Sequence, residues 1–148
     1  MDGVAVAYLP SDVPLPNPDP WEKRFWGFCG ERSLRFQACA DCGHVRHPPM
    51  PYCSVCRSPA EKWLEASDDA ELFTYTVIHH ANHPALKDTV PYNAALVVFP
   101  ALQSVRLVTN IVGCTNDELK IGMPLTLVWE EPRPGKVLPR FKPAGERR

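Results

Sequence analysis

Two cysteine pairs lie close together in the stretch CADCGHVRHPPMPYCSVC. Within each pair two residues separate the cysteines, so one tight turn can direct both sulfur atoms at the same ion. Gly43 follows the first pair, where a positive φ would let backbone donors face the thiolates. The PPMPY run stiffens the connection between the pairs. The spacing therefore predicts one tetrahedral metal site formed by Cys39, Cys42, Cys53 and Cys56.

Four thiolates fill the coordination shell of a zinc ion and leave no position for water or substrate. We therefore expect one structural zinc per chain. Iron in the same sulfur cage is an alternative, because ligand softness and geometry do not exclude it. A thioredoxin-type dithiol explains two such pairs less well, since the βαβ context of that motif is missing. A ribbon of about 25 residues buries too little apolar area to fold without help, so the metal should fold it.

The composition favours turns and extended segments over long helices, because 17 of the 148 residues are proline. Runs of high β propensity are expected to form strands at residues 61–65, 72–80, 95–99, 105–113 and 124–131. Short strands with turn signals between them predict a small closed or partly closed barrel. We therefore expect a mostly β protein.

Recurring prolines at residues 1–18 are typical of an extended arm. Asp19 then suits a helix N-cap and Pro20 the first helical position, so a helix should follow. We divide the chain into an arm at 1–18, a helix with the zinc ribbon at 19–60, and a barrel with a C-terminal tail at 61–148.

Aromatic side chains crowd the expected helix. One interpretation is that they pack on the core of their own domain. The other is that they dock on a second subunit, because the segment follows a loose arm and is rich in tryptophan and phenylalanine. The candidate interface residues are Trp21, Phe25, Trp26 and Phe28.

The net charge of −1 supplies no global field to attract nucleic acid or anionic membranes. The sequence has no apolar run long enough to span a bilayer and no signal-peptide pattern at its start, so we expect a cytoplasmic protein. Its cysteines should then be reduced or metal-bound. Cys29 and Cys114 lie outside the cluster and are expected to pack as small apolar side chains.

The motif HHANH places His79, His80 and His83 at the end of a strand, where a long loop begins. A second metal or catalytic site is one interpretation, and a polar loop rim is the favoured one, since His79 and His80 would point to opposite faces of a strand. The chain contains no nucleophile elbow, phosphate-binding glycine loop, dinucleotide fingerprint or HExxH motif. The sequence therefore offers no self-sufficient active site.

The order of segments resembles a known family. An aromatic FW helix, the segment LRFQACADCGHVRHPPMPYCSVC, the strand TYTVIHH, the run VPYNAALVVF and the run LKIGMPLTLVWEE are followed by PRFKP. This order is similar to that of the zinc-ribbon plus OB-fold proteins, filed as a domain of unknown function, that accompany thiolase-like and other acyl-CoA enzymes. The resemblance spans residues 19 to about 143, and only the HHANHPALKD loop departs from it.

The resemblance implies a zinc ribbon followed by a five-stranded OB-fold barrel. It implies that the four cysteines hold zinc, that the helix and ribbon contact another subunit, and that the barrel contacts the coenzyme A part of a thioester. Members of the family assist thiolases, acyl transferases that make small ketones, and aldolases that shorten steroid side chains held as CoA thioesters. The resemblance thus implies an accessory, non-catalytic subunit in a hetero-oligomer with a thiolase-like protein that carries the catalytic residues.

Two other functions stay open at this point. As an OB fold, the barrel could bind single-stranded nucleic acid by stacking bases on Tyr75, Tyr92 and Phe99. Lys87 is the only lysine or arginine between residues 77 and 99, so the electrostatic contribution to such binding is small. A stand-alone enzyme that uses the histidine loop is the third hypothesis.

Overall fold

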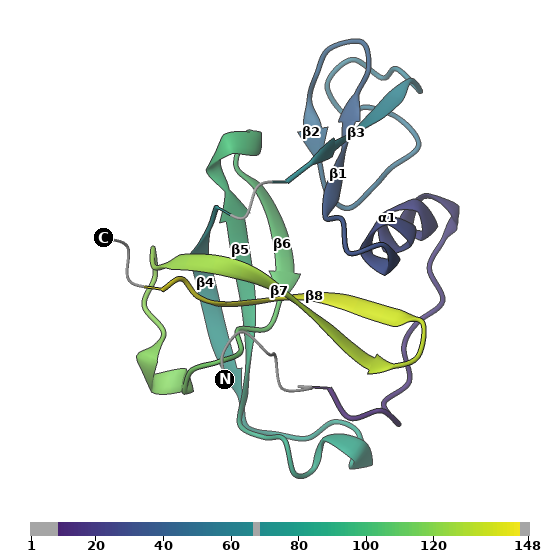
Figure 1. Cartoon of the computed structure of the whole chain (residues 1–148). Helices are drawn as coiled ribbons and strands as arrows, with labels where there is room; N and C mark the ends of the chain where they lie inside the picture. Colours follow the sequence, from purple (N-terminus) through teal and green to yellow (C-terminus); the bar gives the residue numbers. More distant parts are fainter. Residues whose placement is uncertain (1–8, 67–68, 146–148) are drawn as a thin grey trace.

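The structure is a computed structural model that describes residues 9–66 and 69–145. These residues form one α-helix, eight strands and three short 3₁₀ helices, shown in Figure 1. The α-helix is α1 (Pro20–Gly30), and the strands are β1 (Arg35–Cys39), β2 (Val45–Arg46), β3 (Glu61–Glu65), β4 (Ala70–Ile78), β5 (Tyr92–Phe99), β6 (Val105–Thr109), β7 (Pro124–Arg133) and β8 (Lys136–Pro143). The 3₁₀ helices are η1 (Pro84–Leu86), η2 (Pro100–Leu102) and η3 (Asn116–Glu118).

The strands form two separate antiparallel sheets. The ribbon sheet has the order β2-β1-β3, and the barrel sheet has the order β6-β5-β4-β7-β8. A parallel bridge between Ile111 and Phe141 brings the chain after β6 against β8 and nearly closes the barrel. The prediction of a mostly β fold, with one N-terminal helix, a ribbon and a five-stranded barrel, is confirmed.

Two details of the predicted strand set are wrong. The expected strand at residues 61–65 exists, but it pairs with β1 along its whole length and so completes the ribbon sheet. The fifth barrel strand is instead β8, which the prediction missed because Pro139 and Pro143 weaken its strand signal. The predicted division of the chain after residue 60 stays a prediction.

A chain of aromatic rings joins the helix, the ribbon and the barrel into one core. Phe36 of β1 lies 6.3 Å from Phe25 of α1 and 5.0 Å from Phe99 of β5, measured between ring centroids. Phe99 lies 5.8 Å from Phe141 of β8. All four side chains are buried, as is Cys29. The ribbon is therefore packed against the barrel rather than tethered beside it.

The helix begins and ends on local backbone signals. The Asp19 side chain accepts a hydrogen bond of 2.7 Å from the Glu22 backbone N–H, which confirms the expected N-cap. At the C-terminal end the left-handed conformation falls on Arg32 (φ 56°), two residues beyond Gly30. The Ser33 N–H then bonds back to the Phe28 carbonyl, which directs the chain into β1.

Gln103 fastens the ribbon to the barrel through both ends of its side-chain amide. Its Oε1 accepts a hydrogen bond of 3.0 Å from the Val45 N–H, and its Nε2 donates to the Gly43 carbonyl at 2.9 Å. Gln103 lies in the turn between β5 and β6, and it is held there in the left-handed region at φ 59°. The first cysteine turn of the ribbon is thereby attached directly to a barrel turn.

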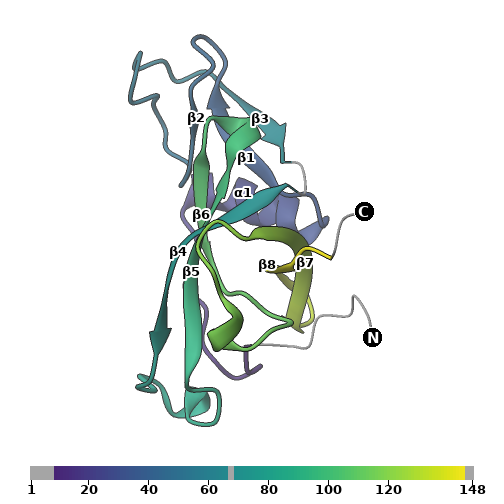
Figure 2. The same cartoon turned by 90° about the vertical axis from the view of Figure 1, so that its left-hand side faces the viewer.

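The hairpin formed by β4 and β5 projects beyond the rest of the barrel, as Figure 2 shows. β5 follows β4 as far as Ile78, which pairs with Tyr92. β7, on the other side of β4, pairs only with Ala70 and Glu71. The outer part of this hairpin therefore depends on contacts other than sheet pairing.

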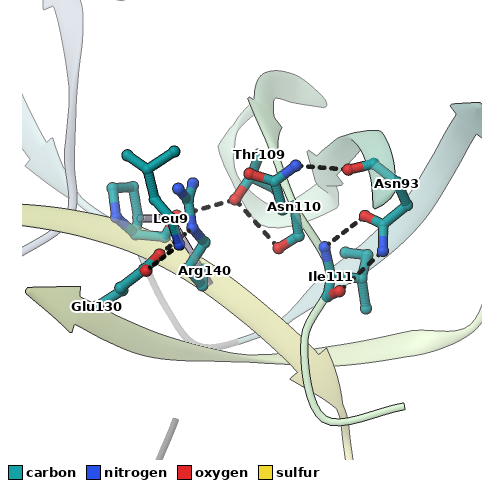
Figure 3. Close-up of polar contacts among 8 residues, drawn as sticks. Leu9, Asn93, Thr109, Asn110, Ile111, Glu130 and Arg140 are labelled. Carbon is teal, nitrogen blue, oxygen red and sulfur yellow. Dashed lines mark hydrogen bonds and ion pairs between the residues drawn. The ribbon is translucent and has the colours of Figure 1, made fainter. Parts of the chain in front are cut away.

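A buried amide provides such contacts at the base of the projection (Figure 3). The Asn93 side chain accepts a 2.7 Å hydrogen bond from the Ile111 N–H and donates a 2.9 Å bond to the Ile111 carbonyl. It also donates to Asn116 Oδ1 at 3.1 Å. The side chain of Asn93 thus anchors the chain that follows β6 to β5.

Replacing Asn93 with alanine should lower the free energy of unfolding by about 2–3 kcal/mol, because it leaves buried backbone groups of Ile111 unpaired. Urea unfolding followed by circular dichroism measures this loss. Asn82→Ala, in the exposed part of the β4–β5 loop, is the matched control and should change stability by less than about 0.5 kcal/mol. Equal stability of the two variants would contradict the role assigned to Asn93.

The described part of the N-terminal arm, residues 9–18, has no helix or strand and is bonded to the β7–β8 hairpin. The Leu9 N–H donates to Glu130 Oε2 at 2.6 Å, and Glu130 is also paired with Arg140 at 2.7 Å (Figure 3). Arg133 donates to the carbonyls of Ser11 and Val13. The rest of the predicted arm, residues 1–8, lies outside the described residues.

Candidate functional site

The four predicted cysteines meet at the tip of the ribbon. Their sulfur atoms all lie within 4.8 Å of one another, and this is the one group of potential metal ligands found among residues 9–66 and 69–145. The Cys39 and Cys56 sulfurs are 3.5 Å apart, and those of Cys42 and Cys53 are 3.6 Å apart. Each close contact joins one pair to the other, as a shared ion requires.

Both cysteine turns direct backbone N–H groups at sulfur. The Cys39 sulfur accepts from the N–H groups of Asp41 and Cys42 at 3.4 and 3.3 Å. These donors, with the Cys42 N–H as the larger cause, lower the pKa of Cys39 to about 6. In the second turn the Val55 N–H donates to the Cys53 sulfur at 3.4 Å. Such donors favour the thiolate that a metal needs.

The two turns share one backbone pattern. The Gly43 N–H bonds to the Cys39 carbonyl at 2.9 Å, and the Arg57 N–H bonds to the Cys53 carbonyl at 2.8 Å. Both Gly43 (φ 82°) and Arg57 (φ 67°) adopt the left-handed conformation. The predicted positive φ of Gly43 is confirmed, whereas the equivalent conformation of Arg57 in the second turn could not be predicted from its residue type.

The cluster fits a structural zinc. Four sulfur donors at these separations suit tetrahedral coordination and supply the complete ligand set of a structural site. A metal there would fix the positions of the two turns and thereby fold the ribbon.

Gln37, which sequence reasoning missed, positions the linker between the cysteine turns. This fully buried side chain accepts a 2.8 Å hydrogen bond from the Met50 N–H and donates a 3.0 Å bond to the Met50 carbonyl. It also donates to Glu61, which is paired with Arg24 of α1. A polar residue in a run of buried β1 positions was the signal that could have identified it.

The predicted interface residues differ in how far they are exposed. Phe25 is 2% exposed and belongs to the core, so it offers a partner almost no surface. Trp26 is 38% exposed. Trp21 and Phe28 are half-buried, and the Phe28 ring lies 5.3 Å from that of Trp63. A contact of Trp21, Trp26 and Phe28 with a partner stays a prediction.

A cavity of about 430 Å³ lies where α1, the ribbon and the barrel meet. Phe25 and Trp26 of α1, His47 of the ribbon, and Val108 and Leu138 of the barrel are among its lining residues. A second cavity of about 350 Å³ lies beside it, between the arm, α1 and the β7–β8 turn. Trp26 and Leu138 line both cavities. Together the two cavities form a mainly apolar groove along the helix, and Glu22 also lines both of them.

His47 is expected to make the stability of the folded chain depend on pH. Burial lowers the pKa of its imidazole from the ordinary 6.5 to about 4. Glu22, Arg106 and Arg140 line the same cavity. The unfolded chain takes up a proton on His47 near pH 6.5, whereas the folded chain does not until about pH 4. The stability that neutral His47 contributes is therefore present above pH 6.5 and is lost as the pH falls toward 4.

Substitution of His47 by phenylalanine should flatten the decline in unfolding free energy between pH 6.5 and pH 5. Urea unfolding at each pH, with zinc content checked in parallel, measures the slope. His80→Phe replaces an exposed histidine outside this cavity and is the control. Indistinguishable slopes for wild type and His47→Phe would contradict the assignment.

The histidine loop does not form a cluster within the described residues. His79 and His80 are exposed, and His79 lines a shallow cavity of about 480 Å³ with Asp117 and Asn116. His83 instead caps η1, because its Nδ1 accepts a 3.0 Å hydrogen bond from the Ala85 N–H. The three imidazoles therefore have separate environments, and a role in substrate binding stays a prediction.

One of the three residues that the nucleic-acid hypothesis expects to stack on bases is inaccessible. Phe99 is 1% exposed and packs between Phe36 and Phe141, so no base can reach its ring. Tyr75 and Tyr92 are half-buried. Tyr75 also donates a long hydrogen bond of 3.5 Å to the Leu119 carbonyl.

Comparison with known proteins agrees with the geometry. The model of the ChsH2 rubredoxin-like zinc ribbon domain matches residues 26–61, and that of the ChsH2 C-terminal OB-fold domain matches residues 63–130. A solved structure titled Ltp2-ChsH2(DUF35) aldolase is 38% identical and superposes with a TM-score of 0.80 over 88% of this chain and 100% of that chain. The chain belongs to the ChsH2 family of DUF35 proteins.

Two of the curated relatives are named as hydratase alpha subunits. The chain is 43% identical to a probable enoyl-CoA hydratase alpha subunit of Thermomonospora curvata, over 77% of this chain and 34% of that protein. It is 33% identical to the 3-oxo-4,17-pregnadiene-20-carboxyl-CoA hydratase alpha subunit of Mycobacterium tuberculosis, over 68% of this chain and 31% of that protein. The chain thus spans about a third of the length of both relatives.

Within residues 9–66 and 69–145, this ChsH2-type fold contains a single α-helix, α1, of 11 residues. None of the helices in the described ranges is both long and apolar enough to cross a membrane.

Proposed function

We propose that this chain is an accessory, non-catalytic subunit of a thiolase-like acyl-CoA enzyme, in which it supports assembly and acyl-CoA binding. The observation that carries the proposal is the match to the Ltp2-ChsH2(DUF35) aldolase structure, which extends over that whole chain and therefore includes both the ribbon and the barrel. Two relatives are named as the alpha subunits of a probable enoyl-CoA hydratase and of a 3-oxo-4,17-pregnadiene-20-carboxyl-CoA hydratase. The reaction of the complex would make or break a carbon–carbon bond, as in aldolase-type shortening of steroid side chains.

The arrangement of the cysteines supports a non-catalytic role. Four sulfurs in one cluster suit a structural ion, and a reducing compartment such as the cytoplasm would keep them available to it. The described residues contain no other group of potential metal ligands. The turnover chemistry would then reside on the partner subunit.

The groove along α1 supports acyl-CoA binding. Its two adjoining cavities suit a long, mainly apolar ligand, and ligand pockets often form where separate units meet. The groove also borders β5 and β6, the OB-fold strands whose outer face commonly binds ligands. Trp26, which lines both cavities, would contact the thioester or the partner.

Co-expression with a thiolase-like protein from the same genome tests the proposal. We expect the two chains to purify together as a stable hetero-oligomer, and the complex to turn over an acyl-CoA that the isolated chain does not. Trp26→Ala should weaken the complex or its acyl-CoA affinity, with the exposed Ile121→Ala as control. A chain that no such protein retains, or that turns over the thioester unaided, would refute the proposal.

A further inference from the structure

The outer face of the sheet formed by β4, β5 and β6 carries a column of uncharged side chains. Along β5 the side chains alternate, so that four are buried inside the barrel and the other four lie on the outer face. Figure 2 shows β4 and β5 along one side of the barrel, with β7 and β8 on the opposite side. The four outer side chains of β5 are all half-buried, and they are Tyr92, Ala94, Leu96 and Val98.

Two exposed apolar side chains flank this column, one on each side. Leu96 of β5 pairs with Val108 of β6 on one side and with Thr74 of β4, next to Phe73, on the other. Val108 is 72% exposed and Phe73 is 40% exposed. The Arg106 guanidinium lies 4.0 Å from the centroid of the Phe73 ring, so both side chains lie on this face. Exposed apolar side chains that gather on one face indicate an interaction surface.

The charges of these three strands lie on opposite sides of the column. Glu71 of β4 and Arg106 of β6 are the two charged residues among the strand residues, and both are exposed. Val98 of β5 pairs with each of them, so the three residues form one row across the sheet. Within residues 9–66 and 69–145, neither charge belongs to an ion pair. The β4 side of the face is therefore acidic and the β6 side basic.

The register makes this face complementary to a second copy of itself. If two such sheets stack about a two-fold axis parallel to β5, the β6 side of one copy lies over the β4 side of the other. Arg106 then meets Glu71 of the second copy, and Val108 meets Phe73 of the second copy. Each contact occurs twice, and the two β5 columns pack against each other along the axis.

We propose that this outer face is a self-association surface on which two copies of the chain form a two-fold dimer. The matched charges and the uncharged column favour a second copy over a nucleic acid, whose phosphates require several positive side chains. The inference goes beyond the proposed function, because it concerns contact between two accessory chains rather than contact with the thiolase-like partner. A complex that contains this dimer would contain its accessory chains in pairs.

Sedimentation velocity of the zinc-loaded chain should show monomer converting to dimer as the concentration rises through the micromolar range. Glu71→Arg should weaken the dimer at least about tenfold, because it brings two positive charges together at both symmetry-related contacts. Arg106→Glu should weaken it to a similar extent by bringing two negative charges together. Lys62→Glu, a charge reversal on the exposed side of β3 in the ribbon, is the matched control and should dimerise as the wild type does.

Mixing the two charge variants tests the pairing itself. A Glu71→Arg chain and an Arg106→Glu chain have opposite charges at both contacts, so the mixture should dimerise with wild-type affinity although neither variant does so alone. Damage to the fold of either variant cannot produce this rescue.

Three results would overturn the inference. They are a wild type that stays monomeric at high micromolar concentration, charge variants that dimerise as the wild type does, and a mixture of the two variants that stays monomeric. These measurements use the chain alone, whereas the proposed function is tested by co-purification with the thiolase-like protein, so the two can fail separately.

Discussion

Replacing Cys53 with serine should reduce the zinc content from one ion per chain to none and unfold the ribbon. Cys53 is 1% exposed and lies within the sulfur cluster, so its loss removes one of four ligands from a buried position. Zinc contributes an apparent free energy of about 10–16 kcal/mol to the folding of small zinc-binding peptides, which is comparable to the total stability of a whole domain. Elemental analysis and hydrogen exchange measure the two effects.

The exchange experiment separates the ribbon from the barrel. Amides of β1 and β3 should lose their protection in Cys53→Ser, whereas amides at the centre of β5 should keep most of theirs, because β5 pairs with both β4 and β6. Cys114→Ser is the matched control, since this half-buried thiol lies outside the cluster. A Cys53→Ser protein that holds one zinc and protects β1 would rule out the four-sulfur site.

Phe36→Ala should destabilise the whole chain by about 3–5 kcal/mol, the usual cost of removing a buried phenylalanine. Phe36 is fully buried and contacts rings from both the helix and the barrel. Its removal leaves a cavity at the junction of the helix, the ribbon and the barrel. Urea unfolding with both near-ultraviolet and far-ultraviolet detection measures the loss.

Phe73→Ala provides the comparison for Phe36→Ala. Phe73 is 40% exposed on the outside of the barrel, where the Arg106 guanidinium lies over its ring. Its removal should cost no more than about 1 kcal/mol. If Phe36→Ala were as stable as Phe73→Ala, the aromatic chain would not be the connection between the ribbon and the barrel.

The metal cluster could be predicted because its geometry is local. Two residues between cysteines and a glycine after Cys42 already determine how each turn aims its sulfurs, and the structure agrees. The strands were harder to assign to sheets, because strand propensity does not identify the hydrogen-bonding partner. For this reason the prediction assigns Glu61–Glu65 to the barrel instead of the ribbon sheet. It also misses β8, because the prolines of that segment lower its strand propensity.

Sequence reasoning is limited in the same way when it predicts which side chains of the helix are buried. Phe25 and Trp26 are neighbours in the sequence and equally aromatic, yet one is 2% exposed and the other 38%. An aromatic-rich helix does not reveal which of its faces meets its own core. The cavity at His47 was equally inaccessible to sequence reasoning, because its walls come from three units that only the tertiary fold brings together.

The attachment of Gln103 gives the molecule a built-in spectroscopic reporter. Because one side-chain amide bonds both Gly43 and Val45, its two NH₂ protons sense whether the metal-bearing tip is seated on the barrel turn. Chelation that melts the tip should shift both resonances toward those of a free glutamine, and the rate of that shift would report undocking at a single residue.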